Sequence, residues 1–217
     1  PRVNAGRDLV EGLRRASAYP HAVTEPIRVA ETHISWVLLT GDYAYKVKKP
    51  LKLSFLDYST LERRHALCEE ELRLNRRLAP ELYLGVSAIT GTPQSPRVDG
   101  SGIPLEYAVR MRQFSPGDEL AALLAAGGVT EADLDGLGTT IARFHAAAAT
   151  APAGSDFGEP ATVQRVTSDN FAELQALRES AAWQDRLSVL ARRVGSLHDG
   201  LRALMVERRA QACIREC

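Results

Sequence analysis

Two lysines on one predicted strand are the residues of this sequence best suited to bind an anion. Lys46 and Lys48 lie in the β-like run 43–48, and they share one face with Ala44 because side chains alternate along a strand. Two charges on one face are also typical of a strand that simply faces solvent. A lysine that binds the phosphates of a nucleotide needs a carboxylate from another element to hold it. Both interpretations are open at this point.

A predicted long helix over residues 60–78 offers that carboxylate. The segment 59–62, Ser-Thr-Leu-Glu, matches a capping box, and Pro80 ends the helix. Helical periodicity places Glu71 between two lines of apolar residues, whereas Glu70 falls just outside them. The two lines are formed by Leu67, Leu74 and Leu78, and by Leu61, Cys68 and Leu72. A carboxylate on a buried face is costly unless it is paired. Glu71 is therefore either a partly exposed residue at the helix margin or the partner of a lysine.

Three further motifs carry weaker indications of function. Residues 32–35, Thr-His-Ile-Ser, form a predicted turn whose hydroxyl and N–H groups can face a phosphate. His145 lies at the edge of an apolar helix stripe, which is typical of a structural histidine. Residues 156–158 spell the Asp-Phe-Gly triplet of kinases, but no H-R-D-x-x-x-x-N precedes them and they lie in a Pro/Gly loop. The sequence contains neither G-x-G-x-x-G nor G-x-x-x-x-G-K-[ST].

The elements that position these residues change in character near residue 115. Before it, the sequence predicts a helix over 6–18 and an antiparallel sheet with the 60–78 helix packed against it. The five predicted strands are 27–31, 36–40, 43–48, 82–89 and 105–112, and a loop over 91–102 joins the last two. After it, helices are predicted over 130–148, 168–179, 182–194 and 197–209. The chain is thus an α+β protein of two lobes, 1–112 and 113–217.

Composition excludes several classes of protein. The 217 residues include 27 basic and 27 acidic side chains, and this zero net charge argues against a dedicated nucleic-acid-binding protein. A hydrophobic content of 45% argues against disorder. No run approaches the ~18 apolar residues of a membrane span, and no signal peptide opens the sequence. Three cysteines without a CxxC pair favour a reduced compartment, so we expect a cytoplasmic protein without membrane or nucleic-acid partners.

Six segments taken together resemble the bacterial aminoglycoside-phosphotransferase-like family, a branch of the protein-kinase-like superfamily. They are ETHISWV (31–37), YAYKVKKP (43–50), FLDYSTLE (55–62), CEEELRLNRRLAPELYLGV (68–86), EYAVRMRQF (106–114) and LGTTIARFH (137–145). The resemblance covers nearly the whole chain. It implies a protein-kinase-like fold: a small N-lobe with a five-stranded antiparallel sheet and a helix, and an incomplete helical C-lobe. Members of this family are often fused to a C-terminal P-loop kinase domain.

The resemblance also implies roles for single residues, with ATP and Mg²⁺ as cofactors. Lys46 would be the lysine that binds phosphate, with Lys48 as the fallback. Glu71 would be its helix partner, with Glu70 as the fallback. Thr32, His33 and Ser35 would belong to the phosphate-side loop, and Met111 and Arg112 would lie at the hinge where backbone groups meet adenine.

One departure from the family bears on activity. In the family, a segment resembling His-Gly-Asp-Leu-His-x-x-Asn follows a stretch like residues 212–217, and this sequence stops there. We therefore expect the N-terminal part of an ATP-dependent small-molecule phosphotransferase that lacks the catalytic loop and is inactive alone. Its nucleotide and an unidentified small-molecule acceptor would be the partners. The alternatives are a non-catalytic binding or regulatory module attached to a P-loop kinase domain, and an α+β domain that binds no nucleotide.

Overall fold

The structure is a computed structural model that describes residues 2–177 and 180–216. The chain forms two compact units, Pro1–Val129 and Thr130–Cys217, and each is described by itself. The first unit contains an antiparallel sheet and both of the helices that pack on it. The predicted functional division after residue 112 stays a prediction.

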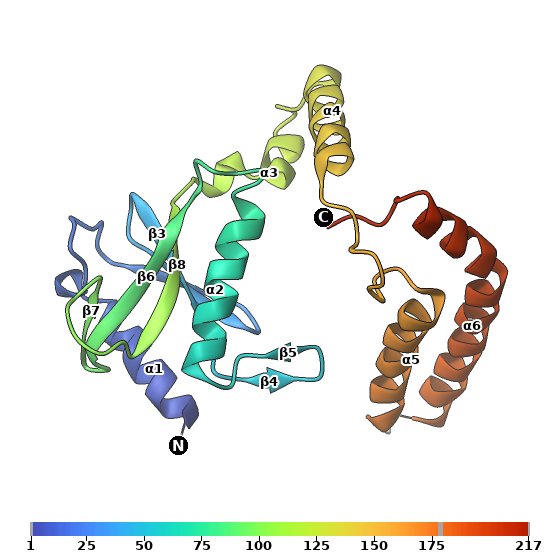
Figure 1. The fold of residues 1–217 in the computed structure, drawn as a ribbon. Helices are drawn as coiled ribbons and strands as arrows, with labels where there is room; N and C mark the ends of the chain where they lie inside the picture. The colour runs from blue at the N-terminus through green and yellow to red at the C-terminus, as the bar shows by residue number, and fades with distance from the viewer. Residues whose placement is uncertain (1, 178–179, 217) are drawn as a thin grey trace. The chain divides into compact units, whose positions relative to one another are not determined.

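Six strands form the sheet of the first unit (Figure 1). In spatial order they are β1 (Arg28–Glu31), β2 (Ser35–Leu39), β3 (Tyr43–Lys48), β8 (Glu106–Arg112), β6 (Tyr83–Thr92) and β7 (Ser95–Val98). All neighbouring strands are antiparallel. The prediction of one antiparallel sheet that contains the five expected strands is confirmed. The predicted number of strands is wrong.

The sixth strand, β7, lies inside the segment predicted as a loop. Gly91 has a φ of +89°, a conformation that glycine adopts readily, and the chain then turns back so that Thr92 faces Ser95 and Ile89 faces Val98. Val98 is buried, which ties the strand to the core. Pro96 is compatible with this position because β7 is an edge strand. The turn residues concealed a hairpin that the loop composition did not predict.

Helix α2 (Leu61–Asn75) packs on β8 and β6. Its N-cap is Thr60, whose hydroxyl oxygen accepts a hydrogen bond from the N–H of Arg63. The predicted capping box placed the cap one residue earlier, and Ser59 instead donates to Asp57. The helix also ends three residues before its predicted end, and Leu78 is exposed.

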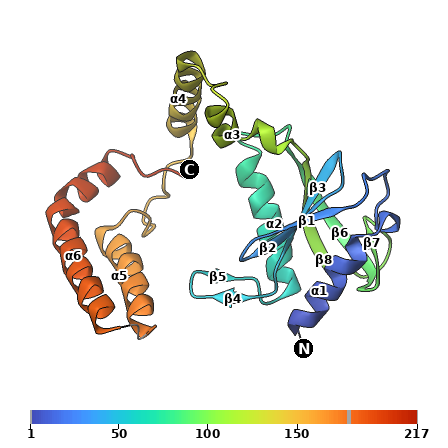
Figure 2. The ribbon, with the colours of Figure 1, turned by 180° about the vertical axis from the view of Figure 1, so that it is seen from behind.

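Helix α1 (Arg2–Leu13) covers the opposite face of the sheet, as Figure 2 shows from behind. A short 3-10 helix, Ala16–Ala18, follows it, so the helix predicted over 6–18 is interrupted. The core lies between α1 and the sheet and includes Leu9, Val10, Leu13, Trp36, Leu38, Tyr45, Val47, Ile89 and Ala108. Because Tyr45 and Val47 face this core, the residues that alternate with them on β3, Lys46 and Lys48, face α2.

Three short elements complete the first unit. The two-stranded hairpin of β4 (Lys52–Leu53) and β5 (Leu56–Asp57) precedes α2 and was not predicted. A 3-10 helix, Pro116–Asp118, and helix α3 (Leu120–Ala125) follow β8. In residues 2–177 and 180–216, no helix is long and apolar enough to cross a membrane.

The second unit is helical. Helix α4 (Glu131–Ala147) is close to its prediction and begins with a capping box formed by Thr130 and Asp133. Helices α5 (Pro160–Ala176) and α6 (Ala181–Ala210) pack against each other. The prediction of two helices over 182–194 and 197–209 is wrong, because Gly195 lowers helix propensity by only ~1 kcal/mol and α6 continues through it. The predicted start of α5 at residue 168 is also wrong, and residues 178–179 of that prediction lie outside the described residues.

Candidate functional site

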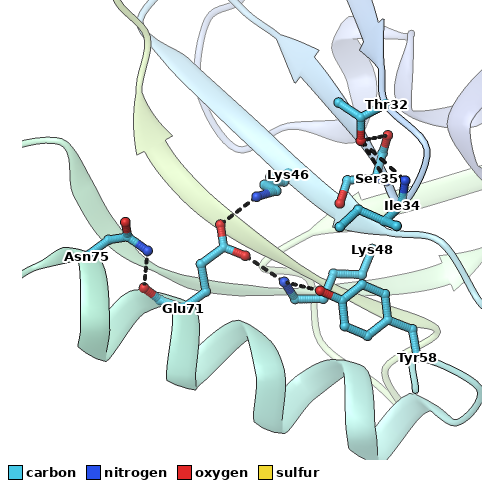
Figure 3. Close-up of polar contacts among 8 residues, drawn as sticks. All are labelled: Thr32, Ile34, Ser35, Lys46, Lys48, Tyr58, Glu71 and Asn75. Carbon is cyan, nitrogen blue, oxygen red and sulfur yellow. Dashed lines mark hydrogen bonds and ion pairs between the residues drawn. The ribbon is translucent and has the colours of Figure 1, made fainter. Parts of the chain in front are cut away.

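An ion pair joins the middle of the sheet to α2 (Figure 3). Lys46 Nζ on β3 lies 2.8 Å from Glu71 Oε1 on α2. The Lys46 side chain is 29% exposed and that of Glu71 is 14% exposed. The predicted contact between the two residues is confirmed. It forms because Lys46 alternates with core residues on β3, while Glu71 lies on the side of α2 that packs on the sheet.

Lys48 binds the same carboxylate through its other oxygen. Lys48 Nζ lies 2.5 Å from Glu71 Oε2, and its side chain is only 2% exposed. The ammonium also donates to the hydroxyl of Tyr58 at 3.4 Å and lies 5.0 Å from the centre of that ring. The choice that the sequence left open between Lys46 and Lys48 therefore ends with both lysines on Glu71. Glu70, the fallback carboxylate, pairs with Arg73 instead.

The charges of this cluster stabilise one another against the cost of burial. Burial by itself raises the pKa of Glu71, but the hydrogen bonds from Lys46 and Lys48 outweigh it and hold that pKa below its ordinary value. Burial likewise lowers the pKa of Lys48, and the hydrogen bond and charge of Glu71 outweigh it and raise that pKa. The nearby Cys68 thiol stays neutral, because burial raises its pKa to about 12. Two ammonium groups thus share one carboxylate, and the cluster keeps a surplus positive charge.

Helix α2 is fixed to the sheet at two further places. Arg64 donates through Nε to both carboxylate oxygens of Glu106, at 3.0 Å and 2.8 Å, and both residues are buried. Near the other end, Arg76 donates through Nε to the carbonyl of Tyr83 at 2.7 Å. Sequence reasoning missed Arg64. The available indication was its spacing, because Arg64 precedes Glu71 by two helical turns and so lies on the same side of α2.

The predicted phosphate-side loop is a turn that closes on itself. The hydroxyl oxygen of Thr32 accepts hydrogen bonds from the N–H groups of Ser35 at 3.0 Å and Ile34 at 3.4 Å. These two N–H groups are therefore not free to bind a phosphate. His33 is exposed and extends from the tip of the turn. Thr32 also accepts a hydrogen bond on its carbonyl from Lys49 at 2.6 Å.

Ser35 differs from the rest of this turn. Its side chain is buried, and its hydroxyl has no hydrogen-bond partner within the described part of the chain. Ser35 pairs with Lys48 in the register of β2 and β3, so the two side chains lie on the same face of the sheet (Figure 3). An unpaired buried hydroxyl is costly. Ser35 is thus the residue of the turn with a hydrogen bond to offer a ligand.

Met111 and Arg112 lie in the last two residues of β8. Met111 pairs with Ala44 on one side and Tyr83 on the other, and it shares the face of Val109, which pairs with Lys46. The side chain of Met111 therefore lies on the face of the sheet that carries Lys46. The N–H of Arg112 donates to the carbonyl of Leu82 at 2.8 Å, so that N–H is already used within the sheet.

The Mg²⁺ implied by the family resemblance finds no ligand set in this structure. Across residues 2–177 and 180–216, no three His, Cys, Asp or Glu side chains gather closely enough to hold a metal ion. Glu71, the carboxylate nearest to Lys46, is occupied by two ammonium groups. The residues present fit a phosphate group and do not fit a metal ion.

A separate cavity of about 410 Å³ lies in the first unit. Trp36, Leu105 and the buried pair of Arg64 and Glu106 are among its lining residues. None of the residues predicted to bind nucleotide lines it. The cavity is therefore distinct from the cluster around Lys46.

Comparison with known proteins finds relatives but no described function. No family model matches the chain, and no solved structure matches it. The chain is similar to proteins of Mycobacterium tuberculosis and Mycobacterium bovis, each named only as an uncharacterized protein. Each is 35% identical over 196 residues, which cover 89% of this chain and 38% of the relative. The chain thus spans less than two fifths of the length of these relatives.

Proposed function

We propose that the first lobe of this chain is the nucleotide-binding side of an ATP-dependent small-molecule phosphotransferase. The observation that carries the proposal is the ion pair between Lys46 of β3 and Glu71 of α2. In kinase-like folds, a strand lysine held by a helix glutamate binds the phosphates of ATP. The sequence segments that resemble the aminoglycoside-phosphotransferase-like family place the same two residues in these roles.

The geometry around the pair supports phosphate binding. Lys46 is partly exposed, so its ammonium can meet a ligand without leaving the sheet. The surplus positive charge of the cluster attracts an anion, and the unpaired hydroxyl of Ser35 lies on the same face. Met111 gives this face an apolar surface two residues from the register position of Lys46, which suits the flat face of an adenine ring.

Catalysis requires residues that this sequence does not contain. Phosphoryl transfer depends on an acid or base near the acceptor and on metal ions that bridge the phosphates, and the sequence has no H-G-D-x-x-x-x-N segment. We therefore propose that the 217-residue chain binds nucleotide weakly and transfers no phosphate. In the longer relatives, residues beyond the matched part would complete the site.

The second candidate function is a binding or regulatory module without catalysis. The closed turn at Thr32 favours it, because the N–H groups of Ile34 and Ser35 are used within the turn. The two candidates differ in one measurable property. A phosphotransferase relative consumes ATP when its acceptor is present, and a binding module does not.

Calorimetric titration of the 217-residue chain with ATP and with adenosine tests nucleotide binding. We expect saturable ATP binding that Lys46→Met weakens by about tenfold, a loss of ~1.4 kcal/mol, with adenosine affinity unchanged. Lys52→Met is the matched control, because Lys52 is exposed on the β4–β5 hairpin and pairs with Asp57 instead. The absence of ATP binding, or an equal loss in both lysine variants, would overturn the proposal.

An ATP-consumption assay of a full-length mycobacterial relative decides between the two candidates. The acceptors are a panel of sugars and aminoglycosides. Turnover by the relative, with none by the 217-residue chain, supports the phosphotransferase. ATP binding without turnover by the relative under any acceptor favours the module.

A further inference from the structure

We propose that Lys48 is a positioning residue that frees Lys46 to leave Glu71 and bind a nucleotide phosphate. The inference rests on the proposed function and adds a division of labour between the two lysines. Lys46 is the residue that contacts the ligand. Lys48 is the residue that keeps Glu71 paired while Lys46 does so.

The two lysines differ in ways that suit these roles. Lys46 holds Glu71 Oε1 and is 29% exposed, whereas Lys48 holds Glu71 Oε2 and is 2% exposed. The Lys48 ammonium is also held by the hydroxyl and ring of Tyr58. Figure 3 shows Glu71 between the two ammonium groups, with Tyr58 beside Lys48 only. Lys46 can thus move toward a ligand, and Lys48 is fixed.

Electrostatic cost explains why a second lysine is needed. If Lys46 were the only cation on Glu71, its movement toward a phosphate would leave a largely buried carboxylate unpaired. Removal of one partner from a buried pair is strongly destabilising. With Lys48 on the other oxygen, Glu71 keeps a charged hydrogen-bond partner throughout. The energy gained from the bond between Lys46 and the phosphate is then offset only by the loss of one of two pairings.

The same arrangement fixes the direction in which charge changes on binding. The free cluster carries two cations and one anion, so it has a surplus positive charge. A phosphate brings the balancing negative charge to Lys46, on the exposed side. The neutral thiol of Cys68 and the hydroxyl of Tyr58 surround Lys48 on the buried side. The ligand expected at Lys46 is therefore an anion, and the polyphosphate of a nucleotide fits this charge.

Calorimetry of variants of the 217-residue chain tests the division of labour. We expect Lys48→Met to weaken ATP binding by about tenfold, because Lys46 must then remain on Glu71, while adenosine binding stays unchanged. Lys48→Arg restores most of the ATP affinity, since it keeps the positive charge. If Lys48→Met fails to fold, as judged by circular dichroism, Lys48→Gln removes the charge and keeps a polar contact to Glu71. A merely structural role for Lys48 predicts equal losses for ATP and adenosine.

A second readout needs no nucleotide. NMR titration of the Glu71 carboxyl should show a larger rise of its pKa in Lys48→Met than in Lys46→Met, because Lys48 is the more buried partner. The reverse order would overturn the proposal. So would ATP binding that survives Lys46→Met and is lost in Lys48→Met, because Lys48 would then be the phosphate ligand. A wild-type chain that binds no ATP overturns the proposed function together with this inference, whereas normal ATP binding with the wrong order of variants overturns the inference alone.

Discussion

Arg64 and Glu106 form a buried ion pair in which one guanidinium nitrogen, Nε, reaches both carboxylate oxygens, at 3.0 Å and 2.8 Å. Arg64 also donates through Nη1 to the carbonyl of Tyr58 at 2.9 Å, so it joins the first turns of α2 to β8 and to the segment that precedes α2. Burial raises the pKa of Glu106 even though Arg64 opposes that rise. The pair fixes α2 two turns before Glu71, and so it supports the position of the lysine cluster.

Loss of Arg64 should destabilise the first unit strongly. Arg64→Met leaves Glu106 buried without a cation, and breaking a buried pair in this way costs about 3–5 kcal/mol. Urea denaturation followed by circular dichroism measures the change in the free energy of unfolding. Arg63→Met is the matched control, because its neighbouring side chain is exposed and we expect a much smaller loss. Equal losses in the two variants would contradict the assigned role of the buried pair.

The cluster around Glu71 should make stability depend on pH in acid. The folded-state pKa of Glu71 lies below its ordinary value of 4.5, so its contribution to stability is present above that value and is lost as the pH falls below it. The difference in unfolding free energy between wild type and Glu71→Gln should therefore shrink from pH 7 to pH 3. The difference is measured because other carboxyl groups titrate in the same range. A constant difference would show that Glu71 is not paired in solution.

In alkali the same cluster acts through Lys48. Its folded-state pKa lies above 10.5, so its contribution is complete below that value and is lost as the pH rises through the folded-state pKa. The stability difference between wild type and Lys48→Met should be constant near neutral pH and fall only in strong alkali. Denaturation midpoints from pH 7 to 11 provide the measurement. A difference that falls already between pH 7 and 9 would place Lys48 in a different environment.

The two described cysteines should react very differently with thiol reagents. Burial raises the pKa of Cys68 to about 12, and the residue is inaccessible, whereas Cys213 is exposed. Iodoacetamide at pH 8, followed by peptide mass spectrometry, should modify Cys213 and leave Cys68 largely unmodified. Denaturation in guanidinium chloride should expose both. Rapid modification of native Cys68 would mean that α2 does not pack on the sheet as described.

The exposed leucines of α6 should promote self-association of the chain. Leu190, Leu201 and Leu204 are about half exposed, which favours contacts between molecules. The triple replacement of these residues by Gln should raise the soluble concentration and reduce association in sedimentation velocity. Leu187 was expected to be exposed as well, but it is buried. Leu187→Gln is therefore the contrasting variant, and we expect it to destabilise the second unit without improving solubility.

Sequence periodicity determined the parts of the fold in which local rules decide. Alternation on the run 43–48 placed Lys46 and Lys48 on one face, and helical phase selected Glu71 over Glu70. Both predictions are confirmed by the contacts of these residues. The hairpin at residues 40–43 was predicted as well, because Gly41 allows the φ of +104° that this tight turn uses.

Only the tertiary structure decided the partners of residues far apart in the sequence. Strand β7 exists because Val98 gains a place in the core, and Arg64 is buried because Glu106, 42 residues later, meets it there. Helix α6 runs through Gly195 because packing against α5 outweighs a local propensity of ~1 kcal/mol. The sharing of Glu71 by both lysines has the same origin. Local rules choose the face of each element, but the energy of burial chooses which faces meet, and that energy depends on the whole fold.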